Sequence, residues 1–222
     1  MGNLPVSEGE EVDEEAEEEA RRVCDIGRAL LAPRAALTFY ECGEISADSG
    51  TVELLPRDGG RPEALHIGPK VGYLAPARLV AVSIATIGEE LERRMRKLSV
   101  EGDVMTAYYL DLYGTKAMNK VNAANRAHIE AFAGEKGWGV GPVMKPGSAE
   151  GWGIQGQRDL LRLSGAERIG VSIKPSFLLV PYFSGSYVIG IGPDYQGKRA
   201  GFLCHECAKF DTCLWRRENS AA

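Results

Sequence analysis

The chain has 222 residues, of which 44% are hydrophobic, enough for one domain with a core of its own. Its formal net charge of −5 is uneven, because residues 8–20 contain nine acidic residues and no basic one. The remainder is only weakly positive and has no basic stripe, and no apolar run reaches the roughly 20 residues of a membrane span. We therefore expect no nucleic-acid and no membrane partner. The N-terminus lacks a secretory signal, which predicts a cytoplasmic protein.

The first half of the chain alternates between strand and helix patterns. Apolar spacing predicts, in chain order, a helix at 18–31, strands at 36–42, 51–55 and 65–68, a short helix at 70–74, a strand at 79–85 and a helix at 89–98. Residues 79–85 are almost continuously apolar, which is typical of a strand buried on both faces. The T-x-G sequence that ends at Gly88 is expected to open onto a functional site.

The second half begins with a long predicted helix from its N-cap, Asp103, to about residue 133. Its apolar stripe consists mostly of small residues, which permit close packing: Leu110, Gly114, Ala117, Val121 and Ala124. Residues 134–156 hold eight glycines and two prolines and form too long a loop for a simple connection. A short helix at 157–163 then precedes strands at 170–173, 177–180 and 187–191, which we expect to pair with one another through tight turns.

Three of the five cysteines, Cys204, Cys207 and Cys213, lie within ten residues of one another near the C-terminus. Thiolates at C-x-x-C spacing can face a common centre, so this cluster predicts an iron–sulfur cluster or a zinc site. The reducing interior of a cell disfavours disulfides, which supports metal binding. Inert or redox-active thiols are the alternative.

A complete site normally needs a fourth ligand. Cys42, at the end of a predicted strand, is the preferred candidate. His205, an exogenous ligand or a group from a partner protein are the alternatives, although His205 adjoins Cys204 in the chain. Cys24 lies in a predicted helix and is expected to be a small core residue.

Several motifs within residues 79–192 occur in the order and spacing of one known family. They are an apolar strand ending in T-x-G at 80–88, the helix opening at 110–115, the Lys145-Pro146-Gly147 loop with Trp152 and Gln157-Arg158 after it, and residues 169–173 followed by Ser176, Pro181 and Ser184. Together they resemble the activation (reactivation) domain of vitamin B12-dependent methionine synthase and the stand-alone proteins built on it.

This resemblance implies an α+β fold in which helices flank a twisted, mainly antiparallel sheet. It also implies docking on a corrinoid (cobalamin) protein or methyltransferase whose cobalt has been oxidised to Co(II). There the domain presents S-adenosylmethionine as the methyl donor while an electron is supplied from outside. The cofactor-binding residues that the resemblance implies are Lys145, Pro146, Gly147, Ser148, Trp152, Arg158, Pro181 and Ser184. It implies no catalytic residue.

Two features depart from the family. Its S-adenosylmethionine loop reads R-x-x-x-G-Y, whereas this chain has Val143 and Ser148 at the arginine and tyrosine positions. Loss of a guanidinium that pairs with a carboxylate weakens binding, and Lys145 and Arg158 are the candidate substitutes. The methionine synthase domain also lacks the cysteine-rich tail, where a cluster would suit delivery of the activating electron.

The sequence thus predicts an acidic tail at 1–20, an activation-domain-like domain at 21–200 and a cysteine-rich segment at 201–222. The hypothesis that follows is reductive reactivation of a corrinoid methyltransferase system. The alternative is a non-redox module that binds a corrinoid or a partner and carries structural zinc. The chain lacks the D-x-H-x-x-G motif that ligates base-off cobalt, which argues against a corrinoid methyltransferase acting on its own.

Overall fold

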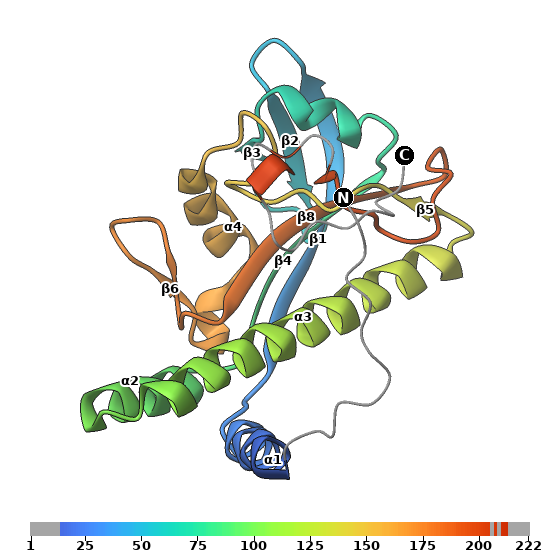
Figure 1. The fold of residues 1–222 in the computed structure, drawn as a ribbon. Helices are drawn as coiled ribbons and strands as arrows, with labels where there is room; N and C mark the ends of the chain where they lie inside the picture. Colours follow the sequence, from blue (N-terminus) through green and yellow to red (C-terminus); the bar gives the residue numbers. More distant parts are fainter. Residues whose placement is uncertain (1–13, 205–206, 208–209, 213–222) are drawn as a thin grey trace.

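The structure, a computed structural model, describes residues 14–204, 207 and 210–212 (Figure 1). Its elements, where η marks a 3₁₀ helix, are α1 (Glu14–Ala29), β1 (Arg34–Ser46), β2 (Thr51–Pro56), β3 (Glu63–His66), η1 (Pro69–Leu74), β4 (Leu79–Thr86), α2 (Glu90–Glu101), α3 (Val104–Glu135), β5 (Gly139–Val140), η2 (Ile154–Gly156), α4 (Gln157–Ser164), η3 (Ala166–Ile169), β6 (Ser172–Ile173), β7 (Leu179–Val180), β8 (Ser184–Gly192) and η5 (Phe210–Thr212). No helix in this part of the chain is both long and apolar enough to cross a membrane.

The main sheet has six strands in the order β3-β2-β1-β4-β8-β5, and every neighbouring pair is antiparallel. This arrangement, with helices packed against the sheet, confirms the predicted fold class. The expected pairing of the last three strands is wrong in one respect. Strands β6 and β7 pair with each other, but β8 inserts between β4 and β5. Seven of its nine residues are buried, so both of its faces need cover that only the interior of the sheet provides.

Strand β4 is buried along its whole length, as its apolar sequence predicts. Val80, Val82 and Ile84 belong to a core cluster that also contains residues of α4 and η1. Leu79 and Ala81 point to the opposite face and pack in a second cluster, together with residues of α3. Because side chains alternate along a strand, β4 is buried between two helical layers. Figure 1 shows the long α3 running beside the sheet, well separated from α4.

The T-x-G turn after β4 serves packing rather than opening onto a site. The Thr86 hydroxyl donates to the Phe183 carbonyl oxygen at 3.1 Å and accepts from the Gly88 amide at 3.1 Å. Both Thr86 and Gly88 are buried. Phe183 in turn belongs to a third core cluster, which joins α1, α2 and α3. The turn therefore fixes the end of β4 against these three helices.

Helix α3 begins as predicted, with the Asp103 carboxylate accepting a hydrogen bond from the Thr106 amide at 3.1 Å. Leu110, Gly114 and Ala117 are buried as expected, but Ala124 is exposed. The predicted stripe repeats every 3.5 residues, whereas a straight α-helix has 3.6 residues per turn, so such a stripe drifts around the helix. Beyond Ala117 the buried side of α3 consists instead of Met118, Asn122, Arg126, Ile129 and Ala133.

Two glycines of α3 provide a matched test of this packing. A Cβ at Gly114 would lie 2.4 Å from Phe183 and 2.7 Å from Leu91, whereas a Cβ at Gly134 would meet nothing within 4 Å. Gly134→Ala should raise the free energy of unfolding by about 0.5–1 kcal/mol through helix propensity. Gly114→Ala makes the same chemical change but should lower it by about 1–3 kcal/mol through overpacking. Equal stabilities in urea denaturation would contradict the close contact at Gly114.

Candidate functional site

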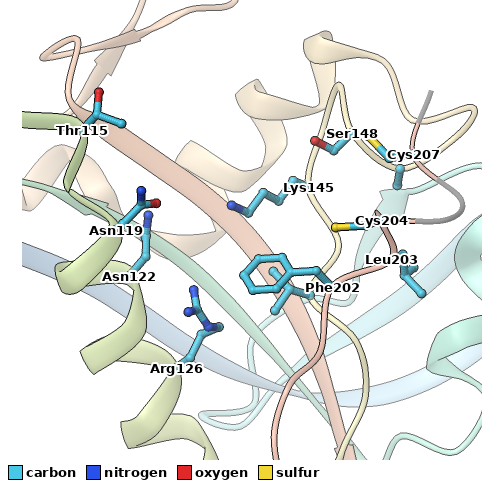
Figure 2. A pocket seen from close by; sticks show the side chains of 12 residues that line it. Thr115, Asn119, Asn122, Arg126, Lys145, Ser148, Phe202, Leu203, Cys204 and Cys207 are labelled. Carbon is cyan, nitrogen blue, oxygen red and sulfur yellow. The ribbon is translucent and has the colours of Figure 1, made fainter. Parts of the chain in front are cut away.

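A cavity of about 360 Å³ lies between α3, the loop after β5 and the C-terminal segment (Figure 2). Helix α3 contributes polar side chains to one wall, namely Thr115, Asn119, Asn122 and Arg126. The loop contributes Val143, Lys145, Ser148 and Ala149. The C-terminal segment contributes Phe202, Leu203, Cys204 and Cys207. These three walls come from parts of the chain that are far apart in sequence.

Backbone hydrogen bonds hold the loop in place between β8 and the C-terminal segment. Met144 and Val188 exchange two of them, at 3.1 and 2.9 Å, and thereby extend the sheet beyond β8. The Val143 amide donates to the Gly201 carbonyl oxygen at 2.8 Å, and Ala149 forms a β-bridge with Cys207. The position of the C-terminal wall therefore depends on the loop, and the position of the loop depends on the sheet.

Two cations approach the same aromatic ring in the cavity. The Arg126 guanidinium carbon lies 4.9 Å from the centroid of the Phe202 ring, and the Lys145 Nζ lies 5.5 Å from it. Both distances are within the range of cation–π attraction, which restrains the two long side chains. The residues named above as lining the cavity include no carboxylate. The described residues therefore place two positive charges at this part of the cavity, where they can attract an anionic group.

Asn122 adds an unusual polar group beside these cations. Its side chain is only 7% exposed, and its Oδ1 has no hydrogen-bond partner among the described residues. A Cβ on Gly185 of β8 would lie 3.1 Å from the Asn122 Nδ2, so α3 and β8 are in close contact here. Buried polar atoms in proteins usually have a partner, which makes this oxygen a candidate ligand contact.

Sequence analysis did not predict the α3 wall. The signal that could have found it is the spacing of Thr115, Asn119, Asn122 and Arg126, which places four polar residues on one side of a helix. Such a row usually faces solvent, so the row alone is ambiguous. Only the burial of Asn122 and Arg126 shows that part of it turns inward.

The predicted loop residues divide into two groups. Lys145 and Ser148 line the cavity, and Gly147, between them, is exposed with a positive φ of 77°. Its amide donates to the Trp152 carbonyl oxygen at 2.8 Å, which closes the loop. Pro146 is buried in the same loop, and Trp152 is buried in the core cluster that contains residues of α4. None of Gly147, Pro146 and Trp152 is among the residues that line the cavity, so their roles in binding stay predictions.

The other three predicted ligand contacts do not line this cavity. Arg158 is exposed on α4, and its guanidinium carbon lies 5.0 Å from the centroid of the Phe177 ring. The Ser184 hydroxyl donates to the Pro181 carbonyl oxygen at 2.7 Å. This turn faces α2, since the adjacent Tyr182 amide donates to the Glu92 carboxylate at 3.0 Å. Their roles in binding stay predictions.

The predicted metal ligands are only partly brought together. Cys204 and Cys207 line the same cavity, joined by a turn in which the Cys207 amide donates to the Cys204 carbonyl oxygen at 3.1 Å. Cys42 lies on β1, packs against the core cluster that contains α4 residues, and has a pKa raised by burial. Among the described residues, no three histidine, cysteine or acidic side chains form a metal-binding group, and the role of Cys42 as the fourth ligand stays a prediction. Cys213 lies outside the described residues.

Two further expectations concern histidine and cysteine. His205, the alternative fourth ligand, also lies outside the part of the chain that the structure describes. Cys24 is exposed on α1, so the prediction that it is a core residue is wrong. Its neighbour Val23 is buried instead, because α1 turns the side that carries Val23 and Ile26 toward α2 and α3.

No protein family model and no curated protein sequence matches the chain. Among solved structures, the crystal structure of the MetH reactivation domain bound to AdoHcy is similar to it, with a TM-score of 0.55. The two sequences are 15% identical, and the similarity covers 88% of this chain and 71% of that chain. The chain therefore has a fold similar to that of the MetH reactivation domain.

The free energy of unfolding should depend on pH through Tyr187 of β8, whose hydroxyl feels the charge of Arg126. Burial raises its pKa from 10.0 to about 12, although the Arg126 charge opposes the shift. The unfolded chain thus loses this proton at a lower pH than the folded chain. The contribution of Tyr187 to the free energy of unfolding is therefore fully present below pH 10. It should fall by about 2 kcal/mol as the pH rises to 12.

Tyr187→Phe should therefore flatten the decline of unfolding free energy between pH 10 and 12, measured by urea denaturation. Tyr108→Phe, at a residue that is 54% exposed, is the matched control and should retain the decline of the unmodified protein. An unchanged slope in Tyr187→Phe would contradict the assignment.

Proposed function

We propose that this chain is a stand-alone activation-domain-like protein that docks on the corrinoid protein of a B12-dependent methyltransferase system and supports its reductive reactivation. The observation that carries the proposal is the fold shared with the MetH reactivation domain over 88% of this chain. The motifs by which the sequence resembles that family lie in this same fold. In particular, the loop with Lys145 and Ser148 forms one wall of the cavity.

An S-adenosyl compound is the proposed ligand of this cavity. The similar crystal structure contains AdoHcy, a compound of this class. The cavity volume, about 360 Å³, lies within the range of roughly 300–1,000 Å³ that is usual for small-molecule sites. Val143, at the position where the family has arginine, contributes an apolar side chain to the wall, while Lys145 directs a cation toward Phe202. The charge that a carboxylate needs is therefore present without that arginine.

The cysteine-rich segment is proposed to hold an iron–sulfur cluster, with Cys204, Cys207 and Cys213 as its protein ligands. The described residues supply two of these thiols in one turn, which fits part of such a site. A cluster or a zinc site normally takes four ligands, so the described residues alone do not complete one. When bound, an iron–sulfur cluster supplies one-electron chemistry. The chain contributes two thiols at the wall of the proposed ligand cavity.

The alternative is a docking module without redox chemistry, in which the same thiols hold structural zinc. The bridge between Ala149 and Cys207 fits a structural role, because zinc at Cys207 would also stabilise the cavity wall. The two candidates share the fold and the cavity. They differ in the metal and in whether the protein is coloured.

Metal analysis of anaerobically purified protein separates the two candidates. A cluster predicts iron, sulfide and broad absorbance near roughly 400 nm, from charge transfer between thiolate or sulfide and iron. Cys204→Ser and Cys207→Ser should each lose most of the iron, because each removes a ligand. Cys24→Ser, an equivalent change at an exposed position on α1, should retain it. Zinc alone would select the docking module, and the absence of any metal would contradict both metal sites.

A further inference from the structure

Arg126 and Asn122 lie four residues apart on α3, and both line the cavity. We infer that together they form a recognition site for the amino-acid end of the ligand. In this site Arg126 pairs with a carboxylate, and Asn122 accepts a hydrogen bond from the neighbouring ammonium group. The inference rests on the proposed function and deepens it, because an S-adenosyl amino acid carries both groups.

The first argument is charge in a restricted setting. Arg126 is 9% exposed, and its contact with Phe202 fixes the direction of the guanidinium. Lys145 approaches the same ring from the loop, so two positive charges converge from different walls (Figure 2). A planar guanidinium can form two parallel hydrogen bonds with a carboxylate, an arrangement that a lysine cannot reproduce. Arg126 is therefore the anchoring cation, and Lys145 adds attraction.

The second argument comes from Asn122, one helical turn before Arg126. Asn122 lines the cavity, and its buried side-chain oxygen has no hydrogen-bond partner among the described residues. The amide lies close to β8, since a Cβ on Gly185 would be 3.1 Å from the Asn122 Nδ2. A ligand that donates an N–H at this point would satisfy it. An acceptor and a cation on adjacent turns of one helix match the ammonium and carboxylate groups of an α-amino acid.

Isothermal titration calorimetry with two related compounds tests this inference. AdoHcy carries the amino-acid end, whereas 5′-methylthioadenosine lacks it and keeps the nucleoside. The unmodified protein should bind AdoHcy about tenfold or more tightly than methylthioadenosine, because charge-assisted hydrogen bonds are lost with the smaller compound. Arg126→Gln should weaken AdoHcy binding by about tenfold or more and leave methylthioadenosine binding unchanged.

Lys120→Gln is the matched control, since it removes a positive charge from an exposed position of the same helix and should change neither affinity. Circular dichroism establishes that each variant is folded. Should Arg126→Gln not fold, Lys145→Gln takes its place and should selectively weaken AdoHcy binding by a smaller factor. Full AdoHcy affinity in the folded variant, or equal affinity of the unmodified protein for both compounds, would overturn the inference.

Failure of the proposed function has a different signature. If the unmodified protein binds neither compound, the S-adenosyl ligand is wrong, and inorganic pyrophosphate then probes the anion site alone. If pyrophosphate raises the melting temperature of the unmodified protein but not that of Arg126→Gln, an anion site at Arg126 is upheld. If pyrophosphate does not raise the melting temperature of the unmodified protein, the anion site is overturned.

Discussion

The architecture depends on burial of β4 on both faces while it pairs along both edges. Antiparallel partners run its full length, from Leu79 opposite Glu41 and Ile191 to Thr86 opposite Arg34 and Ser184. A strand of this kind cannot face solvent, so helical layers must cover both sides of the sheet. Helix α4 and the short helices cover one side, and the long α3 covers the other. The remaining elements are arranged around this constraint.

The cavity follows from the same arrangement. Strand β8 brings Val188 beside β4, and Val188 pairs with Met144, so the loop is held at the sheet and near α3. The loop in turn pairs with the C-terminal segment, which places Phe202 opposite Arg126. Each wall is thus fixed by the previous one. These contacts result in a cavity whose described walls carry two cations and a pair of thiols, and this cavity is the physical basis for the proposed reactivation role.

Local patterns in the sequence predict much of the fold. The apolar run of β4 and the N-cap at Asp103 lead to the observed elements, because burial and capping leave a local signature. The pairing of β8 was not predictable in this way, since the partners of a strand depend on contacts distant in the chain. A tight turn after β7 favours a local hairpin, and only the need to bury both faces of β8 overrides it.

The site was predictable only where a motif marks it. Lys145, Ser148, Cys204 and Cys207 belong to recognisable motifs, and all four line the cavity. Arg126 lies in a helix whose other polar residues are mostly exposed or half-buried, so its sequence context does not distinguish it from a solvated arginine. Whether a residue of α3 faces inward depends on its position around the helix axis, and Arg126 lies on the buried side. Its role becomes apparent only when Phe202, from a distant part of the chain, is placed beside it.

The most direct test of the proposed role is spectroscopic. The protein is mixed anaerobically with a methionine synthase whose own reactivation domain has been removed and whose cobalamin is held as Co(II), together with S-adenosylmethionine and a one-electron reductant. The account predicts loss of the Co(II) spectrum and formation of methylcobalamin at a rate that rises with the concentration of this protein. An unchanged Co(II) spectrum with this partner and with other corrinoid methyltransferases would contradict a role in reactivation.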